Sequence, residues 1–243
     1  MNLQDVMNQA IADLRANRLA EAEKLFRELL AERPTAPDAL HLLGCTLSKS
    51  GRTDEALELI NRAITLNPQQ PVFHNNLGMI LLTLGRKQEG IKALSQAVAL
   101  QPNSPGTLNI MANALMEVGD LDQAIVSLNH AIRLQPNEAG LVFNLGNCWY
   151  RKGTRISPAT NGQSSAVQDL NNAMACFQRA LAMAPTYVDA ANNLGNTLRA
   201  LGRMDDAIAV WRRANQSYLV ARGPGLAARL GRQVKFTRVF HNR

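Results

Sequence analysis

The chain has 243 residues, a formal net charge of +7 and 46% hydrophobic residues, enough apolar material to bury a core. Its 16 glycines and 10 prolines are too few for a collagen-like or low-complexity chain. No apolar run approaches the roughly 20 residues that a membrane-spanning helix needs. The N-terminus has no basic stretch followed by an apolar one, and the three cysteines are far apart, so we expect no signal peptide, no disulfide framework and a cytoplasmic protein.

Basic charge is concentrated at the C-terminal end. Residues 207–243 contain eight basic residues and no acidic ones, and subtracting these eight from the 26 Lys and Arg leaves 18 against 19 Asp and Glu in the rest. The body of the chain is therefore close to neutral. The high net charge says nothing about the partners of that body.

Two residue types recur every 34 residues, which is the length of a helix–turn–helix repeat. The prolines are Pro34, Pro68, Pro102, Pro136 and, after a longer gap, Pro185, and the glycines are Gly51, Gly85, Gly119, Gly153 and Gly202. The glycines suit the left-handed turn that ends a first helix, and the prolines stop a second helix. This register predicts six units, at 3–36, 37–70, 71–104, 105–138, 139–187 and 188–221.

The six units are not identical, and they differ from one another along the chain. The first is atypical, because polar Gln9 and Asp13 stand where apolar residues are usual, as expected of a unit that caps the stack. The next three begin at prolines suited to a first helical position. The fifth contains a 15-residue insertion, 154–168, whose first part reads as a loop and whose end predicts a helix start near Ala166. The sixth has Leu219 in place of the proline.

The basic segment 222–243 follows the array. Its apolar residues Leu226, Leu230 and Val234 recur four apart, which predicts a short amphipathic helix that caps the last unit. The alternative is a basic arm for an acidic partner, in which each Lys or Arg near a charged surface adds about 1 kcal/mol. Both interpretations stay open.

Several short motifs resemble the core of the tetratricopeptide-repeat (TPR) family. They are Asn76-Leu77-Gly78, Asn144-Leu145-Gly146, Asn193-Leu194-Gly195, Asp54-Glu55-Ala56 and Asp205-Asp206-Ala207. The resemblance covers about nine-tenths of the chain. It implies an all-α, right-handed superhelical solenoid of six helix–turn–helix repeats, with a concave groove lined by the first helix of each repeat. Such a groove binds an extended peptide or a partner protein.

The resemblance also implies which side chains line the groove, and many of them are asparagines. The candidates are Asn75, Asn76, Asn109, Asn113, Asn144, Asn147, Tyr150, Arg151, Asn192, Asn193, Asn196 and Arg199. Asn disfavours a helix by up to about 0.7 kcal/mol relative to Ala, yet its amide can donate and accept at once, as a peptide unit does. The stripe is similar to the asparagine ladder of O-GlcNAc transferases. The alternative is that these amides bond to neighbouring helices.

Other chemistry is not predicted. A carboxylate clamp for chaperone tails needs lysine or arginine at groove positions where this chain has none. His41, Cys45 and His74 lack further ligands, so we expect no metal and no cofactor, and no catalytic motif or specific nucleic-acid site is found. The sequence therefore favours a non-catalytic interaction scaffold. The alternatives are a substrate-recruiting module of a glycosyltransferase-like enzyme, or a repeat protein that its basic end, 212–243, brings to an acidic surface.

Overall fold

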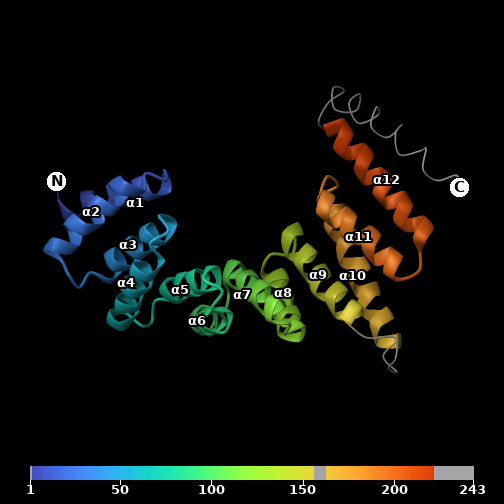
Figure 1. The fold of residues 1–243 in the computed structure, drawn as a ribbon, viewed down its shortest axis with the longest axis horizontal. Coiled ribbons are helices and arrows are strands. Elements are labelled where there is room, and N and C mark those ends of the chain that lie inside the picture. Colours follow the sequence, from blue (N-terminus) through green and yellow to red (C-terminus); the bar gives the residue numbers. More distant parts are fainter. Residues whose placement is uncertain (1, 156–162, 222–243) are drawn as a thin grey trace, which may run out of the picture. The chain divides into compact units, whose positions relative to one another are not determined.

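The computed structural model describes residues 2–155 and 163–221, and these residues form helices and no strand (Figure 1). Each predicted unit contains two helices, and the first of them begins at the first residue of the unit. The helices are α1 (Leu3–Arg15), α2 (Leu19–Glu32), α3 (Pro37–Lys49), α4 (Thr53–Leu66), α5 (Pro71–Thr83), α6 (Lys87–Leu100), α7 (Pro105–Val118), α8 (Leu121–Leu134), α9 (Ala139–Arg155), α10 (Gln163–Met183), α11 (Val188–Ala200) and α12 (Met204–Ala221).

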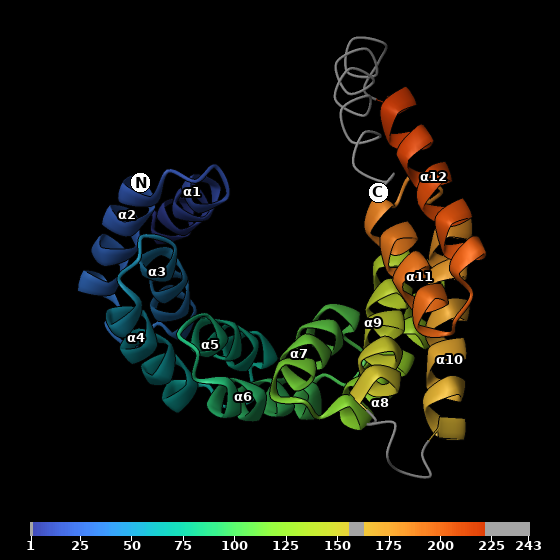
Figure 2. The same ribbon diagram turned by 45° about the vertical axis from the view of Figure 1, so that its right-hand side comes forward.

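Residues 1–120 form one compact unit of the fold and contain α1 to α7. Helices α1, α3 and α5 each pack against the second helix of their own pair and also touch the next first helix, so that α1, α3, α5 and α7 are in contact in turn. The second helices α2, α4 and α6 make no such contacts with one another in the described ranges. Figure 2 accordingly shows the first helices along the inner side of this unit and the second helices along its outer side.

Residues 121–243 form the other compact unit, whose described helices are α8 to α12. Here α9 packs against α8, α10 and α11, and α11 packs against α10 and α12. Its core joins Ala173 and Phe177 of α10 to Leu194 and Leu198 of α11 and Ala207 of α12. The two units are thus built by the same rule, with each helix packed on its neighbours in the chain.

Small residues at one repeated position allow the two helices of a pair to approach closely. A Cβ atom at Gly78 would lie 2.7 Å from Cγ of Leu94, and one at Gly146 would lie 2.7 Å from Cε1 of Phe177. Leu94 and Phe177 are fully buried and occupy the same repeated position, so they have little room to move. The periodic pairing of small and large residues is the reason why this sequence forms stacked helix pairs.

The turn glycines behave as predicted in four of the five cases. Gly51, Gly85, Gly119 and Gly202 have φ between 75° and 86°, a conformation that suits glycine. The first unit has Asn17 at the equivalent position, with φ 59°. Asparagine is the residue that best tolerates this conformation after glycine.

Gly153 does not end its helix, and this part of the prediction is wrong. Helix α9 continues to Arg155, and α10 begins at Gln163, three residues before the predicted start at Ala166. A Cβ atom at Gly153 would lie 2.8 Å from Cγ of Leu170 and 2.9 Å from the carbonyl oxygen of Ala166. The glycine therefore serves a close approach between two lengthened helices. The described part of the insertion, 154–155 and 163–168, is helical rather than a loop.

The two polar departures of the first unit satisfy each other. Oδ1 of buried Asp13 accepts hydrogen bonds from Nε2 of Gln9 at 3.1 Å and from Nε of Arg18 at 2.9 Å. The bonds from the Arg18 guanidinium hold the pKa of the Asp13 carboxyl below its usual value. A carboxylate can be buried here because it is paired with the Arg18 guanidinium and accepts a further hydrogen bond from Gln9.

Two predictions fall on other parts of the chain. The capping helix predicted within 222–243 lies outside the described residues, as does the middle of the insertion, 156–162. Within the described ranges, no helix combines the length and the apolar composition that would let it cross a membrane.

Candidate functional site

All twelve predicted site residues lie on first helices, and they fall into one group in each compact unit. Asn75 and Asn76 are on α5 and Asn109 and Asn113 on α7, in residues 1–120. In residues 121–243 the group comprises Asn144, Asn147, Tyr150 and Arg151 on α9 and Asn192, Asn193, Asn196 and Arg199 on α11. We call these two groups the first-helix faces. Each group is described by itself.

In residues 1–120, Asn76 links two neighbouring first helices. Its Nδ2 lies 2.7 Å from Nε2 of His41 and 3.3 Å from Sγ of Cys45, both on α3. Burial lowers the pKa of His41 to about 4, so the imidazole is neutral near pH 7. A neutral Nε2 that accepts this bond carries its proton on Nδ1. The ring also lies against Phe73, with centroids 4.6 Å apart.

Asn75 is next to this cluster and is less well satisfied. Its Nδ2 makes a long contact, 3.4 Å, with Oδ1 of Asn76, and its own Oδ1 is shielded from solvent without a hydrogen-bond partner among the described residues. A shielded amide oxygen without a partner is unfavourable, because it has lost its water without replacement. This atom is an unused acceptor on the first-helix face.

In residues 121–243, Asn193 plays the part that Asn76 plays in the other unit. Its Nδ2 donates to Oδ1 of Asn147 at 2.7 Å, from α11 to α9. Asn76 and Asn193 occupy the same position of their repeats, and so do their respective partners Cys45 and Asn147. The structural alternative from the sequence therefore holds for Asn76, Asn147 and Asn193, whose amides tie neighbouring first helices together.

The remaining amides differ in their surroundings. Asn113 and Asn196 are half-buried, and neither makes a side-chain hydrogen bond with another described residue. Asn192 is exposed, as are Arg151 and Arg199. An amide side chain offers two donors and an acceptor with two lone pairs, so a single interhelix bond does not exhaust even the paired ones.

The cysteines and histidines form no reactive or metal-binding group in the described ranges. No cluster of three or more His, Cys, Asp and Glu that could hold a metal ion occurs there. All three cysteines are free, and burial raises the pKa of Cys45 and Cys176 to about 11 and that of Cys148 to about 12. Their thiols are therefore protonated near pH 7 and poor nucleophiles.

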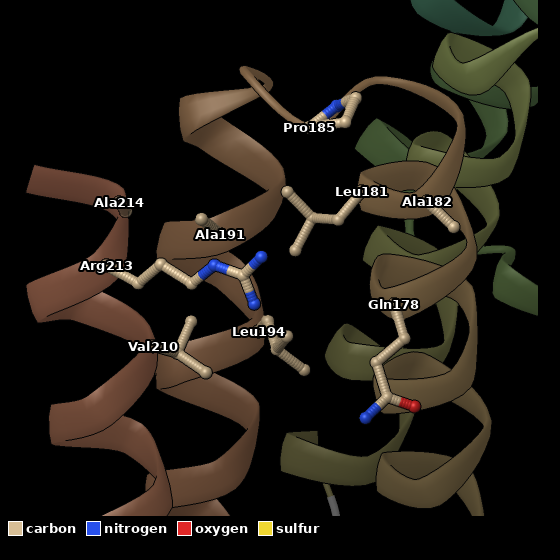
Figure 3. A pocket seen from close by; sticks show the side chains of 9 residues that line it. All are labelled: Gln178, Leu181, Ala182, Pro185, Ala191, Leu194, Val210, Arg213 and Ala214. Atoms are coloured by element: carbon tan, nitrogen blue, oxygen red, sulfur yellow. The ribbon is translucent and has the colours of Figure 1, made fainter. Parts of the chain in front are cut away.

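Sequence reasoning missed two hollows, each lined by two second helices and the first helix between them, and none of the predicted site residues lines either hollow. One, of about 330 Å³, is formed by α10, α11 and α12 (Figure 3). The other, of about 360 Å³, is formed by α4, α5 and α6. Second-helix residues line both hollows: Leu181 and Val210 line the first, and Leu57 and Ala93 line the second. The only signal in the sequence is that residues of different sizes occur at these second-helix positions, and the 34-residue periodicity does not single them out.

These features define a helical-repeat protein whose first helices present a polar, amide-rich face. Models of the tetratricopeptide repeat match residues 13–80 and 47–114, residues 111–154 and residues 176–209. The chain therefore belongs to the tetratricopeptide-repeat family, as the sequence motifs suggested. A search of curated proteins found no match.

Solved structures support the same fold. MamA is 18% identical, with a TM-score of 0.66 over 74% of this chain and 91% of that one. YrrB, described as a TPR protein with an unusual peptide-binding site, is 17% identical, with a TM-score of 0.65 over 79% and 91%. PilF of Pseudomonas aeruginosa is 14% identical, with a TM-score of 0.69 over 86% and 88%. At these identities the likeness is one of fold.

Proposed function

We propose that this protein is an interaction scaffold whose first-helix faces bind an extended segment of a partner protein through the peptide backbone of that segment. The observation that carries the proposal is the alignment of amide side chains along α9 and α11. Asn147 and Asn193 are held in place by their mutual hydrogen bond, and Asn196 lies on the same face with no side-chain partner among the described residues. The peptide-binding site described for YrrB, a protein of similar fold, fits this proposal.

The chemistry of the amide favours the backbone of a ligand over its side chains. A peptide unit has one N–H donor and one C=O acceptor, and an asparagine side chain can satisfy both at once. Interhelix bonds such as Asn193 to Asn147 fix the amide in one orientation before a ligand arrives, which reduces the entropy lost on binding. Recognition of this kind is largely independent of the ligand sequence.

Energetics argue that the asparagines are retained for more than stability. One neutral hydrogen bond contributes about 1 kcal/mol net, and the Asn147–Asn193 pair makes one. The five asparagines on α9 and α11 disfavour their helices by up to about 0.7 kcal/mol each relative to alanine. The hydrogen bond therefore offsets only part of the helix stability that these asparagines cost relative to alanine.

The proposal is tested by replacing Asn144, Asn147, Asn193 and Asn196 together with alanine. Peptides selected from a random library by the native protein should bind the quadruple variant at least tenfold more weakly, because several hydrogen bonds to the ligand are lost at about 1 kcal/mol each. The melting temperature should equal or exceed the native value, by up to about 7 °C, because the four gains in helix propensity, up to about 0.7 kcal/mol each, outweigh the bond of about 1 kcal/mol that is lost. Calorimetry and thermal unfolding measure the two quantities.

A matched control is the double variant Asn129→Ala and Asn171→Ala, which removes amides from the second helices α8 and α10. It should bind the selected peptides as the native protein does. N-methylation of the peptide backbone should abolish binding to the native protein, because it removes the N–H donors. Unchanged affinity of the quadruple variant, or of the N-methylated peptide, would show that the amides do not hold the ligand.

A further inference from the structure

The hollow between α10, α11 and α12 has an apolar interior. Leu181 of α10, Leu194 of α11 and Val210 of α12 contribute its walls, and Pro185 lies in the turn that closes one end (Figure 3). Its volume, about 330 Å³, is at the lower end of the roughly 300–1,000 Å³ of ligand pockets. It has room for one aliphatic side chain of a ligand, and the rest of a longer segment would lie outside it.

A cation stands at the mouth of this hollow. Figure 3 shows the side chain of Arg213 reaching from α12 across α11 toward α10, where Gln178 lies on the opposite wall. Both residues are exposed, and Arg213 has no hydrogen bond or ion pair with any other residue that the structure describes. The planar guanidinium is a fork of donors that matches a carboxylate.

The charge around the hollow favours an acidic occupant. Arg212, next to Arg213, is also exposed. In the sequence, the C-terminal segment 222–243 contains six basic residues and no acidic one. A segment of this chain's own C-terminal end would bring further positive charge to the two arginines, which is unfavourable. An acidic segment from another protein would be attracted instead.

We propose that this hollow binds an acidic, aliphatic segment of a partner protein. A leucine-sized side chain enters between Leu181, Leu194 and Val210, and the carboxylate of a neighbouring Glu or Asp in the same segment binds Arg213. The site is formed by the second helices α10 and α12 together with α11, and none of the predicted first-helix site residues lines it. It is separate from the first-helix faces and does not depend on their function.

A double-mutant cycle tests the proposal on the full-length protein. The probe is a fluorescein-labelled, C-terminally amidated peptide with a Ser-Glu-Leu-Glu-Ser core, whose binding is followed by fluorescence anisotropy. Replacing both Glu by Gln should weaken binding to the native protein about tenfold, since a charge-assisted bond to arginine is lost. The same replacement should change binding to Arg213→Gln by less than about twofold. Arg212→Gln makes an identical change of charge one residue away and should behave as the native protein.

The aliphatic contact is tested with a variant that narrows the hollow. Ala182 is exposed on α10 and lines the hollow, so Ala182→Leu should weaken binding of the same peptide about tenfold. Ala175→Leu, at an exposed position on the same helix that does not line the hollow, is its control.

Three results would overturn the proposal. The first is that the native protein does not bind the Glu-Leu-Glu peptide at about 1 mM, which corresponds to a binding free energy of only about 4 kcal/mol. The second is that Arg212→Gln and Arg213→Gln weaken binding equally. The third is that Ala182→Leu and Ala175→Leu weaken binding equally. The thermal unfolding midpoint of each variant should equal that of the native protein, so that the comparison concerns binding and not folding.

Discussion

His41 is a buried histidine at the contact between α3 and α5, where Asn76 bonds to it and Phe73 covers its ring. Burial lowers its pKa to about 4, whereas an unfolded histidine has a pKa of about 6.5. Between these two values the unfolded chain binds more protons than the folded one. Stability therefore falls as the pH is lowered through this window.

We predict that the free energy of unfolding decreases by about 2 kcal/mol through His41 alone when the pH is lowered from about 7 to about 5. The variant His41→Gln, which cannot be protonated, should lack this part of the decrease. Urea unfolding at the two pH values measures it, and His130→Gln on α8 is the matched control. Identical pH dependence in the native protein and His41→Gln would mean that the histidine is not buried in its neutral form.

At the same scale, the sequence predicted the asparagines as a set but not their individual roles. Asn76 and Asn193 share one repeat position, so their common interhelix bond could be suspected from the register. Their partners are a histidine with a cysteine in one case and an asparagine in the other, which periodicity does not specify. The side-chain rotamers and the spacing between neighbouring helices determine which residues pair, and the sequence of one repeat specifies neither.

At the scale of helices, the repeat register predicted where each first helix begins, because proline and small residues recur at fixed positions. It was wrong at Gly153, which has the residue type of a turn but lies inside α9. Glycine permits a left-handed turn and equally permits close packing. Only the packing of Ala166 and Leu170 against it distinguishes the two uses.

We predict that the insertion can be removed by joining Gly153 directly to Asp169. Thr154, Arg155, Ser164, Ser165, Val167 and Gln168 are exposed, so their removal sacrifices little buried apolar area. Gly153 could then adopt the left-handed turn that Gly119 and Gly202 adopt. Circular dichroism should keep its helical signal, and the melting temperature should change by no more than about 4 °C, which corresponds to roughly 1 kcal/mol.

A large loss of cooperativity in the deletion variant would contradict this prediction. It would mean that the lengthened ends of α9 and α10 stabilise each other beyond what a normal repeat requires. The substitution Gly153→Ala in the full-length chain, whose Cβ atom would lie 2.8 Å from Cγ of Leu170, disturbs the contact between the lengthened helices without shortening them and so separates that case from a strained turn.

At the scale of the whole molecule, each compact unit stacks helices that contact mainly their neighbours in the chain. Such a fold exposes two kinds of surface, one on the first helices and one where two second helices flank a first helix. In this protein the first kind is rich in amides, and the second contains hollows, one of which has apolar walls and Arg213 at its mouth. We therefore expect more than one segment of a partner, or more than one partner, to be bound.

The central claim, that the first-helix face of residues 121–243 holds an extended peptide by its backbone, is tested most directly by NMR. The side-chain amide signals of Asn144, Asn147, Asn193 and Asn196 can be assigned from the single alanine variants. Titration with a library-selected peptide should shift these four signals together, at one common dissociation constant, while the signals of Asn129 and Asn171 on second helices stay in place. Shifts confined to second helices, or none at these four amides under saturating peptide, would contradict the claim.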